Sequence, residues 1–198
     1  MTALRRPLIT ALAVAALAAT TALPFQAARA EAPLAKSQAP GWYRMKVGAF
    51  EVTALSDGTV MLPVDKLLTG NKPAVINSLL ARAYLKAPVE TSVNGYLVNT
   101  GSKLVLIDAG AAGLFGPTLG KLVSNLKAAG YTPEQVDEIY ITHMHPDHVG
   151  GLVVDGQRVF TNAVVRADVR EGGFWLSPAN LEKAPTDAKG FFRARWPR

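Results

Sequence analysis

The chain has 198 residues, of which 49% are apolar and 18% are charged, and its net charge is +6. This composition excludes an intrinsically disordered chain, and the length suits a single domain. Cysteine is absent, which excludes disulfide scaffolds, cysteine-ligated zinc and cysteine nucleophiles. Any bound metal must therefore use histidine and carboxylate ligands.

The excess positive charge lies at the two ends of the chain. Six arginines in the first 30 and last six residues account for the whole net charge: Arg5, Arg6, Arg29, Arg193, Arg195 and Arg198. Nucleic-acid binding needs cations clustered on one surface to neutralise phosphates. A neutral body with basic ends argues against a nucleic-acid partner.

Residues 1–30 have the layout of a secretory signal peptide. Two arginines precede an apolar run at residues 9–23, and Ala28-Arg29-Ala30 forms a small-residue cleavage site. The run is shorter than the roughly 20 residues that a spanning helix needs, which argues against a stable membrane anchor. We expect cleavage after Ala30 and a periplasmic or secreted protein, with residues 31–41 as a flexible arm rich in alanine and proline.

The next segment, up to residue 85, predicts hairpins and a helix. Residues 43–47 and 50–56 alternate apolar and polar side chains, and Asp57-Gly58 predicts a turn into a strand at 59–62. Pro73 opens a helical pattern that extends to about Leu85. The spacing of its apolar residues predicts one buried face, made of Val75, Leu79, Leu80 and Tyr84.

Strands and helices alternate after residue 90. Strands are expected at 92–99, 103–107, 138–142 and 163–167, and the second of these is apolar on both faces, as in a strand buried between layers. Helices are expected at 118–129 and 132–135, and Asp168 is a candidate cap for a helix ending at Trp175. This order predicts an α/β fold in which helices cover a sheet.

All three histidines of the chain lie between Thr142 and Gly151. His143 and His145 are two residues apart, so in extended chain they point to the same side and can share one cation. Asp147 and His148 can face a second cation after a turn begun at Pro146. Imidazole and carboxylate suit zinc, manganese, iron or cobalt, and two such ions can hold a bridging hydroxide nucleophile.

Gly150 and Gly151 follow this motif, and we expect them to let the backbone approach the metals closely. The alternative is a solvent-exposed loop whose histidines merely titrate. A single His-x-His pair would favour that alternative. The full pattern His-x-His-x-Asp-His at a strand end, with no other histidine in the chain, favours the metal site instead.

The segment His143-Met144-His145-Pro146-Asp147-His148 resembles the signature of the metallo-β-lactamase superfamily. Asp108, after the strand at 104–107, is similar to the Asp-Thr-Gly turn of that fold, with Ala109 in place of threonine. The resemblance is strongest to methyl parathion hydrolases, a group of organophosphorus hydrolases, and spans about residues 41–192. The segments that carry it, besides the histidine motif, are 48–59, 97–106, 114–120, 140–142 and 174–177.

This resemblance implies an αββα sandwich with a dinuclear site between two sheets. It implies that His143 and His145 bind one metal, that Asp147 and His148 bind the other with Asp147 in a catalytic position, and that zinc is the first choice ahead of manganese, cobalt or iron. It places Phe115, Trp175 and Phe192 in an aromatic substrate pocket, for which ordinary core packing is the alternative. The implied substrate is a small-molecule ester, hydrolysed by metal-bound hydroxide, and a homodimer is left open.

The sequence departs from the family pattern after His148. Enzymes of this family take further histidine and acidic ligands from a C-terminal half, and no histidine follows His148 here. We therefore expect a partial domain at residues 42–192, with the C-terminal half largely missing, weakened metal binding, and an unrelated basic tail at 193–198. Three hypotheses stand: an organophosphorus triester hydrolase, a lactonase of the same fold, and a truncated, catalytically silent fragment.

The signal-peptide interpretation predicts the N-terminus of the exported protein. N-terminal sequencing and intact mass of periplasmic material should show Glu31 as the first residue, because Ala28-Arg29-Ala30 precedes it. A cytoplasmic product that retains Met1 or Thr2 would contradict this interpretation.

Overall fold

The computed structural model describes residues 32–36 and 39–193. The expected signal peptide at 1–30 and residues 194–198 of the expected basic tail lie outside the described residues. Residues 32–36 are exposed and have no regular secondary structure, and the chain from Ala39 onward forms a separate unit. No helix of the described residues is long and apolar enough to cross a membrane.

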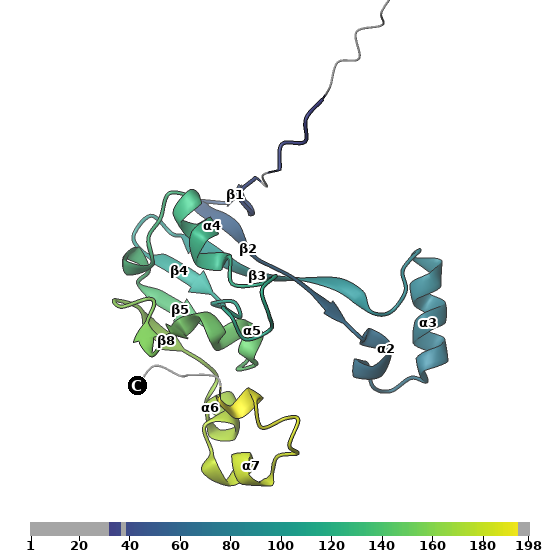
Figure 1. Cartoon of the computed structure of the whole chain (residues 1–198). Coiled ribbons are helices and arrows are strands. Elements are labelled where there is room, and N and C mark those ends of the chain that lie inside the picture. Colours follow the sequence, from purple (N-terminus) through teal and green to yellow (C-terminus); the bar gives the residue numbers. More distant parts are fainter. Residues whose placement is uncertain (1–31, 37–38, 194–198) are drawn as a thin grey trace, which may run out of the picture. The chain divides into compact units, whose positions relative to one another are not determined.

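A six-stranded sheet organises this unit (Figure 1). Its first four strands are antiparallel, and β4, β5 and β8 run parallel to one another. A two-stranded ribbon lies apart from it. In spatial order the sheet strands are β1 (Trp42–Val47), β2 (Phe50–Leu62), β3 (Val89–Asn99), β4 (Leu104–Ile107), β5 (Glu138–Tyr140) and β8 (Val164–Arg166), and the ribbon is β6 (Val153–Val154) with β7 (Gln157–Arg158).

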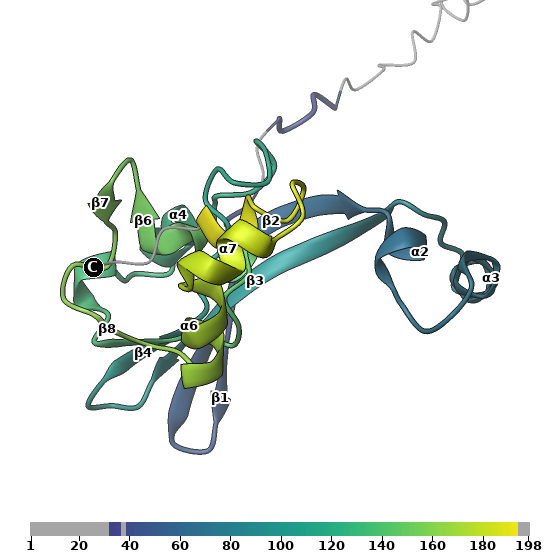
Figure 2. The same cartoon turned by 90° about the horizontal axis from the view of Figure 1, so that it is seen from below.

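Short helices occupy the connections between strands and the chain after the last strand (Figure 2). The α-helices are α2 (Val64–Leu67), α3 (Pro73–Arg82), α4 (Leu122–Ala128), α5 (Pro146–Val149), α6 (Val169–Trp175) and α7 (Pro178–Lys183). The 3-10 helices are η1 (Pro133–Gln135), η2 (Gly150–Leu152) and η3 (Phe191–Arg193). The predicted mixed α/β class is therefore confirmed, although α2, α5, α7, η2, η3 and the β6–β7 ribbon were not expected.

The core lies between the sheet and α4. Leu122 and Leu126 of α4 belong to one buried cluster with Leu55, Leu97 and Leu106, which lie on neighbouring strands. These five side chains are almost completely buried. Burying side chains of this size stabilises the fold by about 1.5–3 kcal/mol each. The cluster fixes the position of β4, after which the site begins.

Asp57 and Gly58 do not form the predicted turn. β2 continues through them with a shift of register between Ser56 and Gly58. The Asp57 carboxylate is 1% exposed and accepts hydrogen bonds from the backbone N–H groups of Ala111 and Leu122, at 2.9 and 3.0 Å. A side chain at Gly58 would place its Cβ 2.0 Å from the carbonyl oxygen of Thr118. The Asp-Gly pair therefore serves a tertiary contact in place of a turn.

The helix predicted at 73–85 ends at Arg82, and its predicted buried face is wrong. Ile76 is the buried residue of α3, whereas Val75 and Leu79 are exposed and Tyr84, after the helix, is 98% exposed. α3 packs on α2 within the β2–β3 connection, at the end of the strand pair (Figure 1), so its apolar residues do not meet the core. Similarly, α4 begins at Leu122, four residues later than expected.

The face of the sheet opposite α4 is largely apolar. Tyr43, Tyr96 and Tyr140 lie on this face in register across the strands, and all three are exposed. In β4, predicted to be buried on both faces, Leu106 toward α4 is fully buried and Val105 and Ile107 opposite are half-buried. Within residues 39–193 one large sheet is present, so the described residues do not form the second sheet of the expected sandwich.

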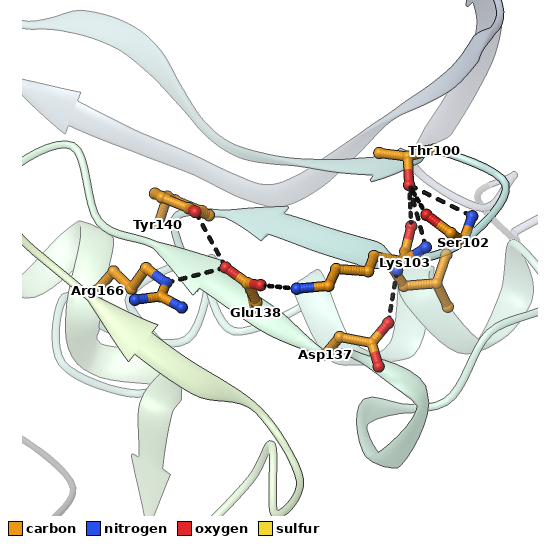
Figure 3. Close-up of polar contacts among 8 residues, drawn as sticks. Thr100, Ser102, Lys103, Asp137, Glu138, Tyr140 and Arg166 are labelled. Atoms are coloured by element: carbon orange, nitrogen blue, oxygen red, sulfur yellow. Dashed lines mark hydrogen bonds and ion pairs between the residues drawn. The ribbon is translucent and has the colours of Figure 1, made fainter.

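Glu138 sits on this same face at the centre of a charged network (Figure 3). Its carboxylate is 8% exposed and contacts the Lys103 ammonium, the Arg166 guanidinium at 2.9 Å and the Tyr140 hydroxyl at 2.9 Å. Hydrogen bonds from Lys103, then Arg166 and Tyr140, lower the pKa of Glu138 from its usual 4.5 to about 2. Through one acid, the network joins β5 and β8 to Lys103, the residue before β4.

This depressed pKa predicts how stability responds to acid. Ionised Glu138 stabilises the folded state above pH 4.5, and this contribution is lost as the pH falls from 4.5 toward 2. The free energy of unfolding of the unmodified chain should therefore fall toward that of Glu138→Gln over this range. Urea unfolding of both proteins at pH 6, 4 and 2.5 measures the difference. A difference that stays constant with pH would contradict the assignment.

Candidate active site

Asp108 is the residue that connects the two segments of the candidate site. It follows β4 directly, is 6% exposed, and adopts a left-handed backbone conformation with φ of 59°. Its carboxylate accepts hydrogen bonds from the backbone N–H and the hydroxyl of Thr142, both at 2.8 Å, and is hydrogen-bonded to Nδ1 of His148, also at 2.8 Å. Asp108 thus ties the end of β4 to both ends of the histidine motif, as expected of a residue near the site.

The three histidine rings come together after β5. The ring centres of His143 and His145 are 4.6 Å apart, and those of His143 and His148 are 3.9 Å apart. His145 is the N-cap of α5, and Pro146 is its first residue. The fixed φ of proline favours the first turn of a helix. The predicted turn at Pro146 is therefore a short helix, which carries Asp147 and His148.

His148 lies between two carboxylates. Its Nδ1 contacts Asp108 and its Nε2 contacts Asp147 at 3.2 Å. Burial alone would lower the pKa of His148, but hydrogen bonds to Asp108 and Asp147 raise it to about 9. Burial likewise tends to raise the pKa of Asp147, and the His148 contact outweighs this and lowers it. The pKa of His143 is lowered by burial and by the neighbouring histidines, which favours its neutral form.

Gly150 and Gly151 serve a different close approach from the one expected. A Cβ at Gly150 would lie 2.4 Å from the carbonyl oxygen of Ala111, and one at Gly151 would lie 2.0 Å from that of Ala109. Both glycines therefore pack against the loop after Asp108. Backbone hydrogen bonds from Ala109 to His148 and from Gly151 to Gly110 join the same two segments.

An aromatic wall stands beside His145. The Trp175 ring lies edge-on to His145 with centres 5.2 Å apart, and Phe191 lies edge-on to it at 5.5 Å. Phe191 also contacts Phe115 at 6.4 Å and Trp175 at 6.3 Å. Phe115 and Trp175, two of the predicted pocket residues, thus belong to one aromatic cluster beside His145. We call Phe115, Trp175 and Phe191 the aromatic wall.

Phe191, and not the predicted pocket residue Phe192, lies beside His145. Phe192 packs against Phe174 and Trp175, with ring centres at 5.5 and 4.7 Å, and within the described residues its ring contacts no histidine ring. Neighbouring phenylalanines in one short helix point in different directions, so the sequence alone could not choose between them. Glu171, which contacts Trp175 and the histidine motif, was also missed. Its spacing of four residues before Trp175 on one helix was the available signal.

The side chains of the histidine motif are of the types that bind divalent metals. Neutral imidazoles and carboxylates bind zinc and related ions, so a metal at His148 must displace the proton that the two carboxylates favour there. A carboxylate such as Asp108 on the far nitrogen of His148 is a common support for a metal-ligating imidazole. Among the described residues, however, no three histidine, aspartate or glutamate side chains are arranged to hold one ion together. The structure places His143, His145, Asp147 and His148 in one cluster without assigning the pairs that the resemblance implies.

Parts of the chain are similar to known proteins of one superfamily. Residues 88–166 match the model of the metallo-beta-lactamase superfamily. The crystal structure of the hydrolase AbOPH of the beta lactamase superfamily is 42% identical, with a TM-score of 0.72 over 79% of this chain and 54% of that one. AidC, a dizinc quorum-quenching lactonase, is 26% identical, with a TM-score of 0.65 over 78% and 58% of the two chains.

Curated relatives match over a shorter stretch. A beta-lactamase-like protein 2 homolog of Caenorhabditis elegans is 40% identical over 60 residues, which are 30% of this chain and 19% of the relative. The exodeoxyribonuclease WalJ of Streptococcus pneumoniae is 38% identical over 64 residues, 32% of this chain and 22% of that protein. The chain thus spans about a fifth of these relatives and little more than half of the solved structures. The fold is that of the metallo-β-lactamases, and the matches support a hydrolase of this superfamily.

Proposed function

We propose that the protein is a metal-dependent hydrolase of small organophosphorus triesters with an aryl leaving group. The observation that carries this proposal is the aromatic wall beside His145, with ring centres 5.2 and 5.5 Å from the imidazole. An aryl group buries its apolar body against such rings while the reacting group meets the histidine cluster. The similarity to the hydrolase AbOPH supports the hydrolytic class.

The proposed metal ligands are the four residues of the motif. His143 and His145 would hold one divalent ion, and Asp147 and His148 the other. Bound divalent ions supply Lewis acidity and an activated water at neutral pH. Two protein ligands for each ion are fewer than the three of ordinary catalytic zinc sites, so we expect weak binding. Zinc suits this donor set best, ahead of manganese, cobalt or iron.

The chain's own residues orient the site. Asp108 holds Nδ1 of His148 and so leaves its Nε2 directed toward Asp147. The contact with His148 lowers the pKa of Asp147, so its carboxylate stays ionised beside the histidines. An ionised carboxylate only accepts hydrogen bonds. Phe191 and Trp175 flank His145 and place apolar rings on one side of the cluster. These contacts leave a polar centre with an apolar border, as in small-molecule sites.

Lactone hydrolysis is the second candidate function. The similarity to AidC, a dizinc quorum-quenching lactonase, favours it. An acyl chain could lie against the same aromatic wall, with the lactone carbonyl in place of phosphorus. We place it second because AbOPH is more similar in sequence, at 42% against 26% identity.

The proposal predicts metal-dependent turnover of a nitrophenyl phosphotriester. With excess zinc or manganese the chain should release nitrophenol slowly, and His145→Ala should reduce the rate by about 100-fold or more, because loss of even a supporting residue costs 10–100-fold. A medium-chain acyl lactone, assayed in parallel, should react more slowly still. Faster lactone turnover would replace the proposal by the second candidate. No turnover of either substrate would support the silent-fragment hypothesis.

The metal assignment has a separate test that needs no substrate. His143→Ala combined with His145→Ala should abolish retention of one of the two ions and weaken the other, because two of the four proposed ligands are lost. Elemental analysis after dialysis against zinc or manganese measures the metal content. Phe115→Ala is the control, since it removes a ring from the aromatic wall and no ligand. Equal metal content in the double mutant and the control would contradict the assignment.

A further inference from the structure

One oxygen of Glu171 accepts two hydrogen bonds from different parts of the site. Oε2 accepts from the backbone N–H of Met144 at 2.8 Å and from the indole N–H of Trp175 at 3.1 Å. Glu171 is half-buried, and Met144 is 3% exposed. Met144 lies between His143 and His145, 27 residues away along the chain. A carboxylate of α6 therefore holds the backbone of the histidine motif.

These contacts link the histidine motif and Trp175 in two ways. Glu171 holds the amide of Met144, the next residue carries the His145 ring, and that ring lies 5.2 Å from the Trp175 ring, which Glu171 also holds. Trp175 is fixed on its other sides by Phe174 and Phe192, at 4.9 and 4.7 Å. The positions of a proposed metal ligand and of the aromatic wall thus share one support.

We propose that Glu171 is a positioning residue that couples the metal-ligating loop to the aromatic wall. The proposal rests on the proposed function, because it assigns a task to the parts which that function uses. Glu171 acts through Met144 and Trp175, and neither of its hydrogen bonds goes to a proposed metal ligand.

The local sequence places Glu171 for this task. Asp168 caps α6 by accepting from the N–H of Arg170, and its carboxylate also binds the Arg170 guanidinium. Glu171 and Trp175 are four residues apart, which puts them on one face of the helix. The rest of the first turn is occupied by the Asp168–Arg170 pair, so Glu171 is left to reach across to Met144.

The geometry separates positioning from charge. Both hydrogen bonds end on the same oxygen, so the single carbonyl oxygen of a glutamine can accept both. Glu171→Gln removes the negative charge and keeps the two contacts. Glu171→Ala removes both, and leaves the buried N–H of Met144 without its acceptor, which is costly. If Glu171 acts by positioning, Glu171→Gln should retain the binding that Glu171→Ala loses. If its charge matters instead, both variants should lose binding to the same extent.

Binding measurements on the full chain test this coupling. Zinc affinity is measured by competition with a chromophoric chelator, and 4-nitrophenol affinity by calorimetry. Glu171→Ala should weaken zinc about 10–100-fold, the usual cost of losing a residue that supports metal ligands, and should weaken 4-nitrophenol as well. Glu171→Gln should resemble the unmodified chain in both. Trp175→Phe, which keeps a ring but loses the N–H, should weaken 4-nitrophenol and keep zinc affinity.

Glu182→Ala, on the exposed surface of α7, is the matched control, and it should change neither affinity. Amide exchange of Met144 in the metal-free chain gives a further readout, which should be faster in Glu171→Ala and unchanged in Glu171→Gln. The proposal is overturned if Glu171→Gln is as weak as Glu171→Ala, or if Glu171→Ala matches the control. If the alanine variant does not fold, the glutamine variant still decides, since its loss of either affinity overturns the proposal. If the chain binds zinc and 4-nitrophenol as expected but does not hydrolyse the phosphotriester, the proposed function is contradicted and the role of Glu171 is not.

Discussion

The carboxylate of Asp108 is the contact on which the rest of the site depends. Its hydrogen bonds to Thr142 and His148 join the end of β4 to the start and the end of the histidine motif. The left-handed backbone of Asp108, at φ 59°, turns the chain away from the strand and leads into Gly110, at φ 75°. Because the carboxylate is almost completely buried, loss of either partner would leave a costly unsatisfied group. The loop after β4 and the motif after β5 therefore keep one relative arrangement.

The position of the site follows from the parallel part of the sheet. β4, β5 and β8 run in the same direction, so their carboxyl ends meet at one edge. Asp108 follows β4, His143 follows β5, and Glu171 lies on the helix that follows β8. Open α/β sheets bind ligands at this edge because the connecting loops converge there. The antiparallel strands β1 to β3 add the hydrophobic core against α4 without contributing to the histidine cluster.

Local signals predicted what depends on local chemistry. The spacing of His143, His145, Asp147 and His148 gave the cluster, because a strand end followed by Pro146 brings nearby residues together whatever lies around them. Asp168 was recognised as a helix cap for the same reason. The predictions that were wrong concern residues whose structure depends on contacts with distant parts of the sequence. The sequence predicts a turn at Asp57, but its carboxylate accepts hydrogen bonds from two backbone amides that lie far along the chain. The sequence also predicts a buried apolar face for α3, but that face does not pack against the core.

Two carboxylates hold the backbone on either side of His143. Asp108 accepts from the amide of Thr142, and Glu171 accepts from the amide of Met144. One carboxylate follows β4 and the other comes from α6, so the peptide that carries His143 is fixed from both sides by elements far apart in the sequence. Neither contact involves a metal ion. The chain can therefore present His143 and His145 in a fixed direction before any metal binds, which lowers the conformational entropy that binding must overcome. This fixed direction would matter most for the proposed metal site, in which each ion would have few protein ligands.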